Sequence, residues 1–233
     1  MADPIIRTES LTKVYRTSNV EVNALRGVDL QIMPGEFTAV AGPSGSGKTT
    51  LLNIISGLDR PTEGKAFLKD QCVKSMKGRE LSDFRRDHIG FIFQSYNLIP
   101  VLTVKENIEY IMLLQGIGAA ERADRVRKIL SDVGLEGMDN RKPPELSGGQ
   151  QQRVAVARAI VSRPDIILAD EPTANLDSRT GAALLDIMRN LNKERGTTFV
   201  FSTHDQMIMD HARRLIHLHD GMIESDETKY SEE

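Results

Sequence analysis

The chain has 233 residues, enough for one large domain or two small ones, and we expect a single domain spanning 1–233. Its 30 lysines and arginines against 33 aspartates and glutamates give a net charge of −3 with both signs interspersed, so no basic stripe predicts a nucleic-acid partner. A single cysteine excludes an intrachain disulfide, and no apolar run approaches the roughly 18 residues that cross a bilayer, so we expect a cytoplasmic chain that reaches a membrane only through a partner.

The first forty residues predict strands separated by turns. Strands are expected over 5–10, 24–33 and 37–41, with a Pro-Gly-Glu turn over 34–36 before the last of them. That strand runs directly into a glycine-rich loop, and the apolar residues after Lys48 recur at helical spacing. The local order is therefore strand, glycine loop, helix.

The segment from about 95 to 163 has a mostly helical pattern, which we interpret as an insert. It begins with a capping box over 103–106, in which a threonine and a glutamate satisfy each other's backbone N–H groups at a helix start. Two more helices are expected over 119–133 and 150–162, and Pro164 ends the second of these.

The remainder of the chain predicts a βαβ unit followed by a terminal hairpin. Short apolar runs over 165–169 and 198–202 are typical of buried parallel strands, and a helical stretch over 178–195 lies between them. The segment 215–223 has an Asp-Gly turn between two short apolar runs, as in a hairpin. The acidic tail from Glu224 is expected to be solvated and mobile.

The glycine-rich loop fits the pattern G-x-x-x-x-G-K-[ST]. Its eight residues are Gly42, Pro43, Ser44, Gly45, Ser46, Gly47, Lys48 and Thr49. Glycines let successive backbone N–H groups wrap a phosphate, while Lys48 can reach the β and γ phosphates and Thr49 can bind Mg²⁺. An ordinary glycine turn is the alternative. The position between a strand and a helix favours phosphate binding, because that mechanism needs both neighbours.

Asp170 and Glu171 follow the apolar strand over 165–169. The carboxyl ends of parallel strands meet in one crevice, so these carboxylates are expected beside the glycine loop. Such a pair after a strand can also simply start a helix. With a nucleotide loop upstream, the favoured interpretation is that Asp170 holds Mg²⁺ through water and that Glu171 orients and polarises the attacking water.

The pentapeptide Leu-Ser-Gly-Gly-Gln over 146–150 lies at the start of the third insert helix. Ser147 and the two glycines offer a hydroxyl and free N–H groups at a helix N-terminus, which suits an anion. Ser147 to Gln150 is also a capping box in its own right. Local chemistry alone does not choose between an anion site and a capped helix start.

These motifs, in this order, resemble the nucleotide-binding domains of ABC transporters, whose signature is this pentapeptide in a helical subdomain between the two ATP-binding motifs. The resemblance covers about 5–223. It implies an α/β fold: a P-loop NTPase core with a mostly parallel sheet, an N-terminal antiparallel β-subdomain and an inserted α-helical subdomain over about 95–163. It also implies a head-to-tail homodimer, in which the signature of one copy closes on the γ-phosphate held by the glycine loop of the other.

Four further positions match the family residue by residue. Tyr15 resembles the aromatic residue that stacks on adenine, and Gln94 resembles the glutamine that contacts Mg²⁺ and senses the permease. His204 resembles the switch histidine that contacts the γ-phosphate, and Asp177 belongs to a segment that resembles the D-loop, which links the two sites of the dimer. Taken alone, each could also be a packing residue or a polar loop residue.

The resemblance implies ATP and Mg²⁺ as cofactors and three groups of site residues. The catalytic residues are Lys48, Glu171 and His204, and the metal-binding residues are Thr49, Gln94 and Asp170. The nucleotide-binding residues are Tyr15, Gly42, Pro43, Ser44, Gly45, Ser46, Gly47, Lys48, Thr49, Thr50, Gln94, Ser147, Gly148, Gly149, Gln150 and Asp177. Because no catalytic residue is replaced, both composite sites of the homodimer are expected to hydrolyse ATP.

Other classes of nucleotide-binding protein fit less well. DNA-repair and chromosome-maintenance ATPases carry long heptad inserts, the translation-factor branch carries two such domains in tandem, and a small-molecule kinase would leave the pentapeptide unexplained. The motifs over 90–100 and 171–178 look most like the branch that serves lipoprotein release, macrolide and antimicrobial-peptide export, and cell division. The alternatives are a polar amino-acid importer ATPase and a soluble ABC-type clamp without transport.

An apolar-rich stretch over 95–102 follows Gln94. Exposed apolar residues there would suit a partner helix, and in the family this region meets the coupling helix of the permease. The same side chains could instead pack inside the insert. The resemblance therefore implies an integral membrane permease as partner and a peripheral location at the cytoplasmic face of the inner or plasma membrane.

Overall fold

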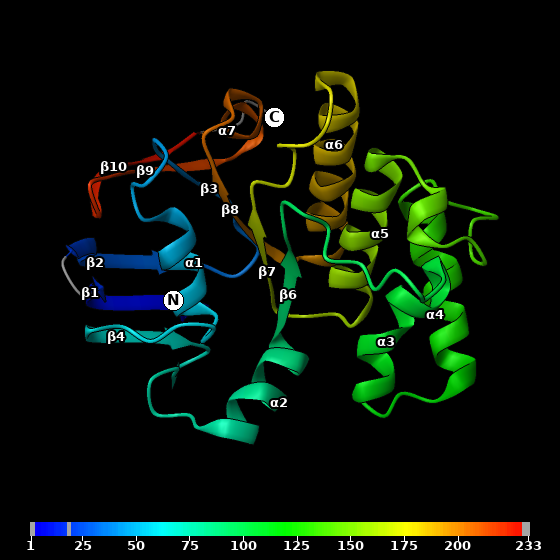
Figure 1. Cartoon of the computed structure of the whole chain (residues 1–233), viewed down its shortest axis with the longest axis horizontal. Helices are drawn as coiled ribbons and strands as arrows, with labels where there is room; N and C mark the ends of the chain where they lie inside the picture. The colour runs from blue at the N-terminus through cyan, green and yellow to red at the C-terminus, as the bar shows by residue number, and fades with distance from the viewer. Residues whose placement is uncertain (1–2, 18–19, 230–233) are drawn as a thin grey trace.

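The computed structural model describes residues 3–17 and 20–229, which form two β-sheets with helices packed on them (Figure 1). The strands are β1 (Ile6–Thr17), β2 (Val20–Ile32), β3 (Phe37–Ala41), β4 (Glu63–Leu68), β5 (Gln71–Cys72), β6 (Ile89–Ile92), β7 (Ile166–Asp170), β8 (Thr198–Thr203), β9 (Arg214–His219) and β10 (Met222–Thr228). The first sheet is antiparallel, with the order β2-β1-β4-β5. The second has the order β10-β9-β3-β8-β7-β6 and is parallel except for β10, which runs antiparallel to β9. The predicted α/β class is therefore confirmed.

Helices connect the strands of the second sheet. They are α1 (Lys48–Ile55), α2 (Gly78–His88), α3 (Val104–Leu114), α4 (Ala119–Asp132), α5 (Gly148–Val161), α6 (Ser178–Arg195) and α7 (Gln206–His211), with a 3₁₀ turn η1 (Pro143–Glu145) before α5. The chain between β6 and β7 forms α3, α4 and α5, which Figure 1 shows on the opposite side of the molecule from β1, β2 and β4. In the part of the chain that the structure describes, no helix has both the length and the apolar character of a membrane span.

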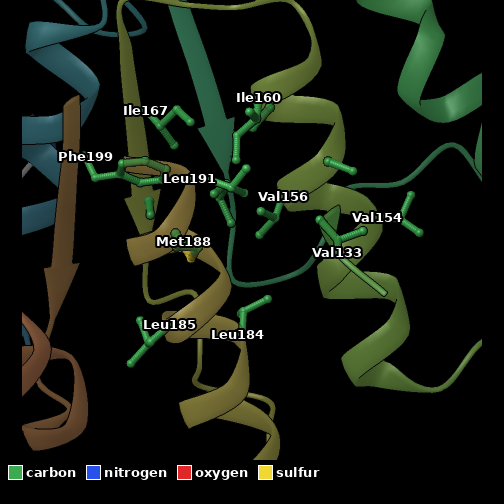
Figure 2. Close-up of a cluster of buried hydrophobic side chains, with 14 of the residues drawn as sticks. Val133, Val154, Val156, Ile160, Ile167, Leu184, Leu185, Met188, Leu191 and Phe199 are labelled. Atoms are coloured by element: carbon green, nitrogen blue, oxygen red, sulfur yellow. The ribbon is translucent and has the colours of Figure 1, made fainter. Parts of the chain in front are cut away.

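The parallel strands of the second sheet are buried on both faces, because apolar residues occupy successive positions along them. In β7, Ile167 and Ala169 belong to one apolar cluster, whereas Ile166 and Leu168 belong to the other. Figure 2 shows Ile167 in the first cluster, beside the apolar side chains of α5 and α6. The second cluster includes the apolar residues of α1 and of the first sheet. The second sheet therefore lies between two cores, and its strand ends are rigidly placed.

Capping residues define the starts of two helices in the segment between β6 and β7. Thr103 Oγ1 accepts a hydrogen bond from the Glu106 N–H at 3.2 Å, and Glu106 Oε2 accepts one from the Thr103 N–H at 2.7 Å. The capping box predicted at α3 is therefore confirmed. Helix α5 begins at Gly148, slightly before the predicted 150, because Ser147 is its N-cap.

The prediction of a mobile tail from Glu224 is wrong for 224–228, and the part of that tail over 230–233 lies outside the described residues. Strand β10 continues to Thr228 and pairs with β9 along that length. Arg214 Nη2 lies 2.6 Å from Asp226 Oδ2, so an ion pair between the two strands stabilises the end of the sheet. The acidic composition of this segment led us to predict a mobile tail, although the segment forms a strand in which Asp226 is paired with Arg214.

The first sheet is larger than predicted. Strands β1 and β2 are longer than the predicted 5–10 and 24–33. Strand β1 continues through 11–17, which pairs with 20–28 of β2 with several register irregularities. Strands β4, β5 and β6 and helices α2 and α7 were not predicted.

Asn192 provides a test of how α6 is fixed to the second sheet. Its buried Nδ2 donates to the carbonyl oxygens of Gly35 at 3.0 Å and Thr197 at 2.7 Å, in the turns that lead into β3 and β8. We expect Asn192→Ala to lower the free energy of unfolding by about 2 kcal/mol, because both carbonyls lose a donor. Asn190→Ala, at an exposed position of the same helix, should change it by less than about 0.5 kcal/mol. Urea unfolding measures both variants, and equal losses would contradict this role of Asn192.

Candidate functional site

Residues from six separate segments line one cavity of about 620 Å³. The glycine-rich loop follows β3, Glu171 follows β7, and His204 follows β8. Parallel strands point their carboxyl ends to the same edge of the sheet, which brings these segments together as predicted. Tyr15 of β1 and Gln94, just after β6, line the same cavity. The cavity thus gathers residues that the sequence analysis selected from five different motifs.

Most of the loop over 43–50 lines this cavity, and two of its glycines are needed for different reasons. A Cβ on Gly47 would meet the carbonyl oxygen of Ala24 in β2, so only glycine fits there. Gly45 has open space around it but a φ of +80°, which disfavours any residue with a Cβ. Val22 and Ala24 also line the cavity and were not predicted. Their spacing puts them on one face of a strand, but the sequence does not reveal that this face meets the loop.

The hairpin of β9 and β10 supports the glycine-rich loop. The Gly221 N–H donates to the carbonyl oxygen of Ser46 at 3.1 Å, and a Cβ on Gly42 would meet the carbonyl oxygen of Leu218. The Gly221 carbonyl in turn accepts a hydrogen bond from the Arg26 N–H at 2.8 Å, which ties the hairpin to β2. The loop is therefore fixed between β2 and the turn of the hairpin.

Lys48 is buried in the loop and has no ion-pair partner among the residues that the structure describes. Its Nζ donates to the carbonyl oxygens of Gly42 at 2.7 Å and Pro43 at 2.9 Å. Burial lowers the pKa of Lys48, although the carboxylates of Glu171 and Asp170 act in the opposite direction. A buried cation at the start of a helix, among loop N–H groups, favours binding of a phosphate.

Thr49 and Asp170 meet beside the loop. Thr49 Oγ1 lies 3.1 Å from Asp170 Oδ1 and 3.2 Å from Asp170 Oδ2. Ser202 Oγ also donates to Asp170 Oδ1, which fixes the carboxylate from the neighbouring strand. Hydroxyl and carboxylate oxygens are the donors that Mg²⁺ prefers, so the residues present fit this metal.

Glu171 is held at the edge of the cavity by three contacts. Its Oε1 lies 2.7 Å from His204 Nδ1, its Oε2 accepts a hydrogen bond from Thr203 Oγ1 at 3.4 Å, and its N–H donates to the Ser202 carbonyl at 3.0 Å. Its φ of +48° lies in the left-handed region, which is costly for a residue with a side chain and recurs at functional sites. The Glu171 side chain is 15% exposed and that of His204 is 67% exposed, so the histidine is the open member of the pair.

The signature pentapeptide does not line this cavity. Ser147 Oγ accepts a hydrogen bond from the Gln150 N–H at 3.3 Å, and Gln150 Oε1 accepts one from the Ser147 N–H at 2.9 Å. Gly148 and Gly149 form the first turn of α5, where a Cβ on Gly149 would crowd the side chain of Thr180. The structure therefore has the capped helix start that the sequence allowed, and an anion at this position stays a prediction.

Asp177 also lies outside the cavity, as the N-cap of α6. Its carboxylate accepts hydrogen bonds from the Thr180 N–H at 3.0 Å and the Thr180 hydroxyl at 2.7 Å, and these bonds lower the pKa of Asp177. Two residues earlier, Asn175 Nδ2 donates to the carbonyl oxygen of Gln94 at 2.8 Å. The segment that contains Asp177 is thus attached to the wall of the cavity through Gln94.

A second cavity, of about 400 Å³, opens beside the segment after Gln94. Its walls come from α2, β6, α3 and α5, and several of its apolar side chains are open to solvent. Leu58 is 48% exposed, Ile99 37% and Tyr110 45%. Arg158 of α5 donates to two successive carbonyl oxygens of the segment over 96–97, at 2.8 Å and 2.5 Å. We call this second cavity the apolar groove.

Together, the phosphate loop, the Asp-Glu pair two strands away and the helical segment with its pentapeptide define an ATP-binding cassette. A family model described as "ABC transporter" matches residues 25–174. The chain therefore belongs to the ABC transporter family, as an ATP-binding and ATP-hydrolysing subunit.

Two relatives cover nearly all of the chain. MJ0796 of Methanocaldococcus jannaschii, an uncharacterized ABC transporter ATP-binding protein, is 44% identical over 227 residues, which are 96% of this chain and 97% of the relative. The dimeric structure of MJ0796 in a post-hydrolysis state, bound to ADP and Pi, matches with a TM-score of 0.89 and 43% identity over 97% of this chain and 99% of that one. The macrolide export ATP-binding/permease protein MacB of Wolinella succinogenes is 42% identical over 223 residues, which are 96% of this chain but 34% of MacB.

Replacing Gly45 and Gly47 by alanine, one at a time, separates the two reasons for glycine in the loop, which are a positive φ and a close approach of the backbone. Gly45→Ala should lower the free energy of unfolding by about 1 kcal/mol, because only the positive φ is penalised. Gly47→Ala should lower it by about 3 kcal/mol, because the new Cβ must also displace the backbone at Ala24. Urea unfolding without nucleotide measures both. If Gly47→Ala is no more costly than Gly45→Ala, Ala24 does not constrain the loop.

Proposed function

We propose that the chain drives a separate membrane permease by ATP-dependent closure of a homodimer, as the ATPase of an exporter or lipoprotein-release system. The observation that carries this proposal is the pairing of Thr49 with Asp170 and of His204 with Glu171 around the phosphate loop. A metal-binding pair and a carboxylate that can accept a proton, both beside bound phosphates, support transfer of a phosphoryl group to water.

In this proposal, one set of groups binds the phosphates and the base of ATP, and another set binds the metal ion. Lys48 and the loop N–H groups bind the β and γ phosphates, and Tyr15 stacks on the base. Thr49, Asp170 and Gln94 hold Mg²⁺, which when bound neutralises negative charge on the phosphate oxygens.

Glu171 is the proposed general base. It accepts a proton from water as the water oxygen attacks the γ-phosphorus, and the bond to the leaving oxygen of ADP breaks on the opposite side. His204, with Nδ1 at 2.7 Å from Glu171 Oε1, keeps the carboxylate turned toward that water and is itself open to the γ-phosphate. No covalent enzyme intermediate forms.

A second copy of the chain completes the proposed site. Ser147 lies outside the cavity of its own chain, so it can contact a γ-phosphate only across an interface. The relative MJ0796 is described as dimeric with ADP and Pi bound, at 43% identity, which supports a dimer here, and we propose that its two copies pack head to tail. The residues over 147–150 of one copy then close on the loop over 42–49 of the other, and Asp177 links the two sites.

The permease is proposed to dock in the apolar groove. The exposed surfaces of Leu58, Ile99 and Tyr110 suit an apolar helix of a membrane partner. MacB is named both an ATP-binding protein and a permease, and this chain matches only 34% of it, which supports a permease as the partner of the chain. Such a partner gives the chain a peripheral location at the cytoplasmic face of the membrane.

Glu171→Gln tests the catalytic assignment. The variant should bind Mg-ATP like the parent but hydrolyse it roughly 10²- to 10⁴-fold more slowly, because an amide cannot accept the proton of the attacking water. Equilibrium binding of ATP and single-turnover release of phosphate measure the two effects separately. Glu194→Gln, which changes an exposed carboxylate on α6, is the matched control and should keep the parent rate. Parent-like hydrolysis by Glu171→Gln would remove this residue from the proposed role.

The type of transporter is tested by purifying Glu171→Gln from native membranes in detergent with Mg-ATP. Mass spectrometry of the co-purifying proteins should identify a stoichiometric permease with few membrane spans and a large extracytoplasmic domain. Adding Tyr110→Glu should abolish recovery of the permease, because a hydrated carboxylate replaces an exposed aromatic ring in the wall of the apolar groove. A permease with many spans would indicate a polar amino-acid importer instead, and the absence of any membrane partner would favour a soluble clamp.

A further inference from the structure

The ring of Tyr15 is fixed by two charged neighbours. Tyr15 and Lys13 are two residues apart on β1, and their side chains lie against each other. Tyr15 Oη donates to Asp59 Oδ2 at 2.7 Å, and Lys13 Nζ lies 4.8 Å from the centroid of the ring. The tyrosine remains 39% exposed at the wall of the phosphate-loop cavity.

Asp59 accepts hydrogen bonds from three different residues. Besides Tyr15, Lys13 Nζ donates to Asp59 Oδ1 at 2.7 Å, and the Arg60 N–H donates to the same oxygen at 2.6 Å. The side chains of Lys13 and Asp59 are only 12% and 29% exposed. Burial opposes the charge of Asp59, but the hydrogen bonds from Lys13 and Tyr15 lower its pKa. Burial and the bond to Asp59 raise the pKa of Tyr15, so at neutral pH the phenol donates and the carboxylate accepts.

Asp59 is also connected to the phosphate loop through α1. This helix begins at Lys48, and after its end the N–H groups of Leu58 and Asp59 donate to the carbonyl oxygen of Asn53 at 2.8 Å and 3.0 Å. The helix has 8 residues and is packed in the second apolar cluster, so it acts as a short rigid spacer. A ring attached to Asp59 therefore stays at a fixed distance from the groups that bind phosphate.

We infer that Asp59 and Lys13 are positioning residues for the nucleotide, which hold the Tyr15 ring ready for a purine base at a span from the phosphate loop set by α1. Lys13 covers one face of the ring and Asp59 fixes its hydroxyl, which leaves the other face for stacking. Because the ring is ordered before the nucleotide arrives, binding does not include the cost of ordering it. The inference rests on the proposed role of Tyr15 as the residue that stacks on the base.

The test compares Mg-ATP with Mg-tripolyphosphate, which has the phosphates but no base. Asp59→Ala should weaken ATP binding roughly two- to tenfold and leave tripolyphosphate binding unchanged, since only the base loses its ordered partner. KM for ATP should rise to the same extent, with kcat at saturating ATP unchanged. Tyr15→Phe, which keeps the ring and removes only the hydroxyl, should weaken ATP binding in the same selective way. Isothermal titration calorimetry measures both ligands.

Glu63→Ala is the matched control, because it removes an exposed carboxylate from the same sheet and should leave both affinities at the parent value. Equal weakening of ATP and tripolyphosphate in Asp59→Ala would assign Asp59 to the shape of the loop and overturn the inference. Unchanged ATP binding in Asp59→Ala, beside a loss in Tyr15→Ala, would overturn the role of Asp59 alone. Parent-like ATP binding in Tyr15→Ala would remove the stacking role itself from the proposed function.

Discussion

A buried positive charge that forms no ion pair with any residue the structure describes is the constraint on which the site depends. Lys48 is removed from water, and its donors meet only the carbonyl oxygens of the loop itself. Desolvation disfavours such a charge unless an anion arrives. Its position at the first residue of α1 adds the positive end of a helix dipole. The carboxylates of Glu171 and Asp170 offset the cost of burying this charge only in part, and a phosphate is the ligand that can pair with it directly.

The fold class and most of the cavity could be predicted because they depend on short stretches of sequence. Consecutive apolar residues over 166–169 indicate a strand buried on both faces, and strand direction then brings Asp170 and Glu171 to the loop. The capping box at Thr103 needs only four residues to be recognised. The family match and the similarity to solved ATP-binding cassettes confirm the class that these local patterns indicated.

What the sequence did not reveal depends on contacts between distant segments. Helix α2 has only two apolar side chains on its buried face, Leu81 and Phe84, and the rest of its sequence is mostly charged, so the sequence gives too few apolar positions to indicate a helix. The wall formed by Val22 and Ala24, and the role inferred for Asp59, follow from packing of the first sheet against the loop. The pentapeptide is a capped helix start within one chain, and the contact with a second copy that we propose for it would leave no trace in local chemistry.

The hydrogen bond from Gly221 to Ser46 joins a late segment of the chain to an early one, so the site is completed late in synthesis. Translation releases the N-terminal segments first, so β3 and α1 leave the ribosome long before β9 and β10. Until the hairpin emerges, the loop lacks one of its two supporting walls and the donor to the Ser46 carbonyl. The nucleotide site therefore gains this support only after the helices between β6 and β7 have been synthesised, so its loop takes its final form late in translation although its own residues are made early.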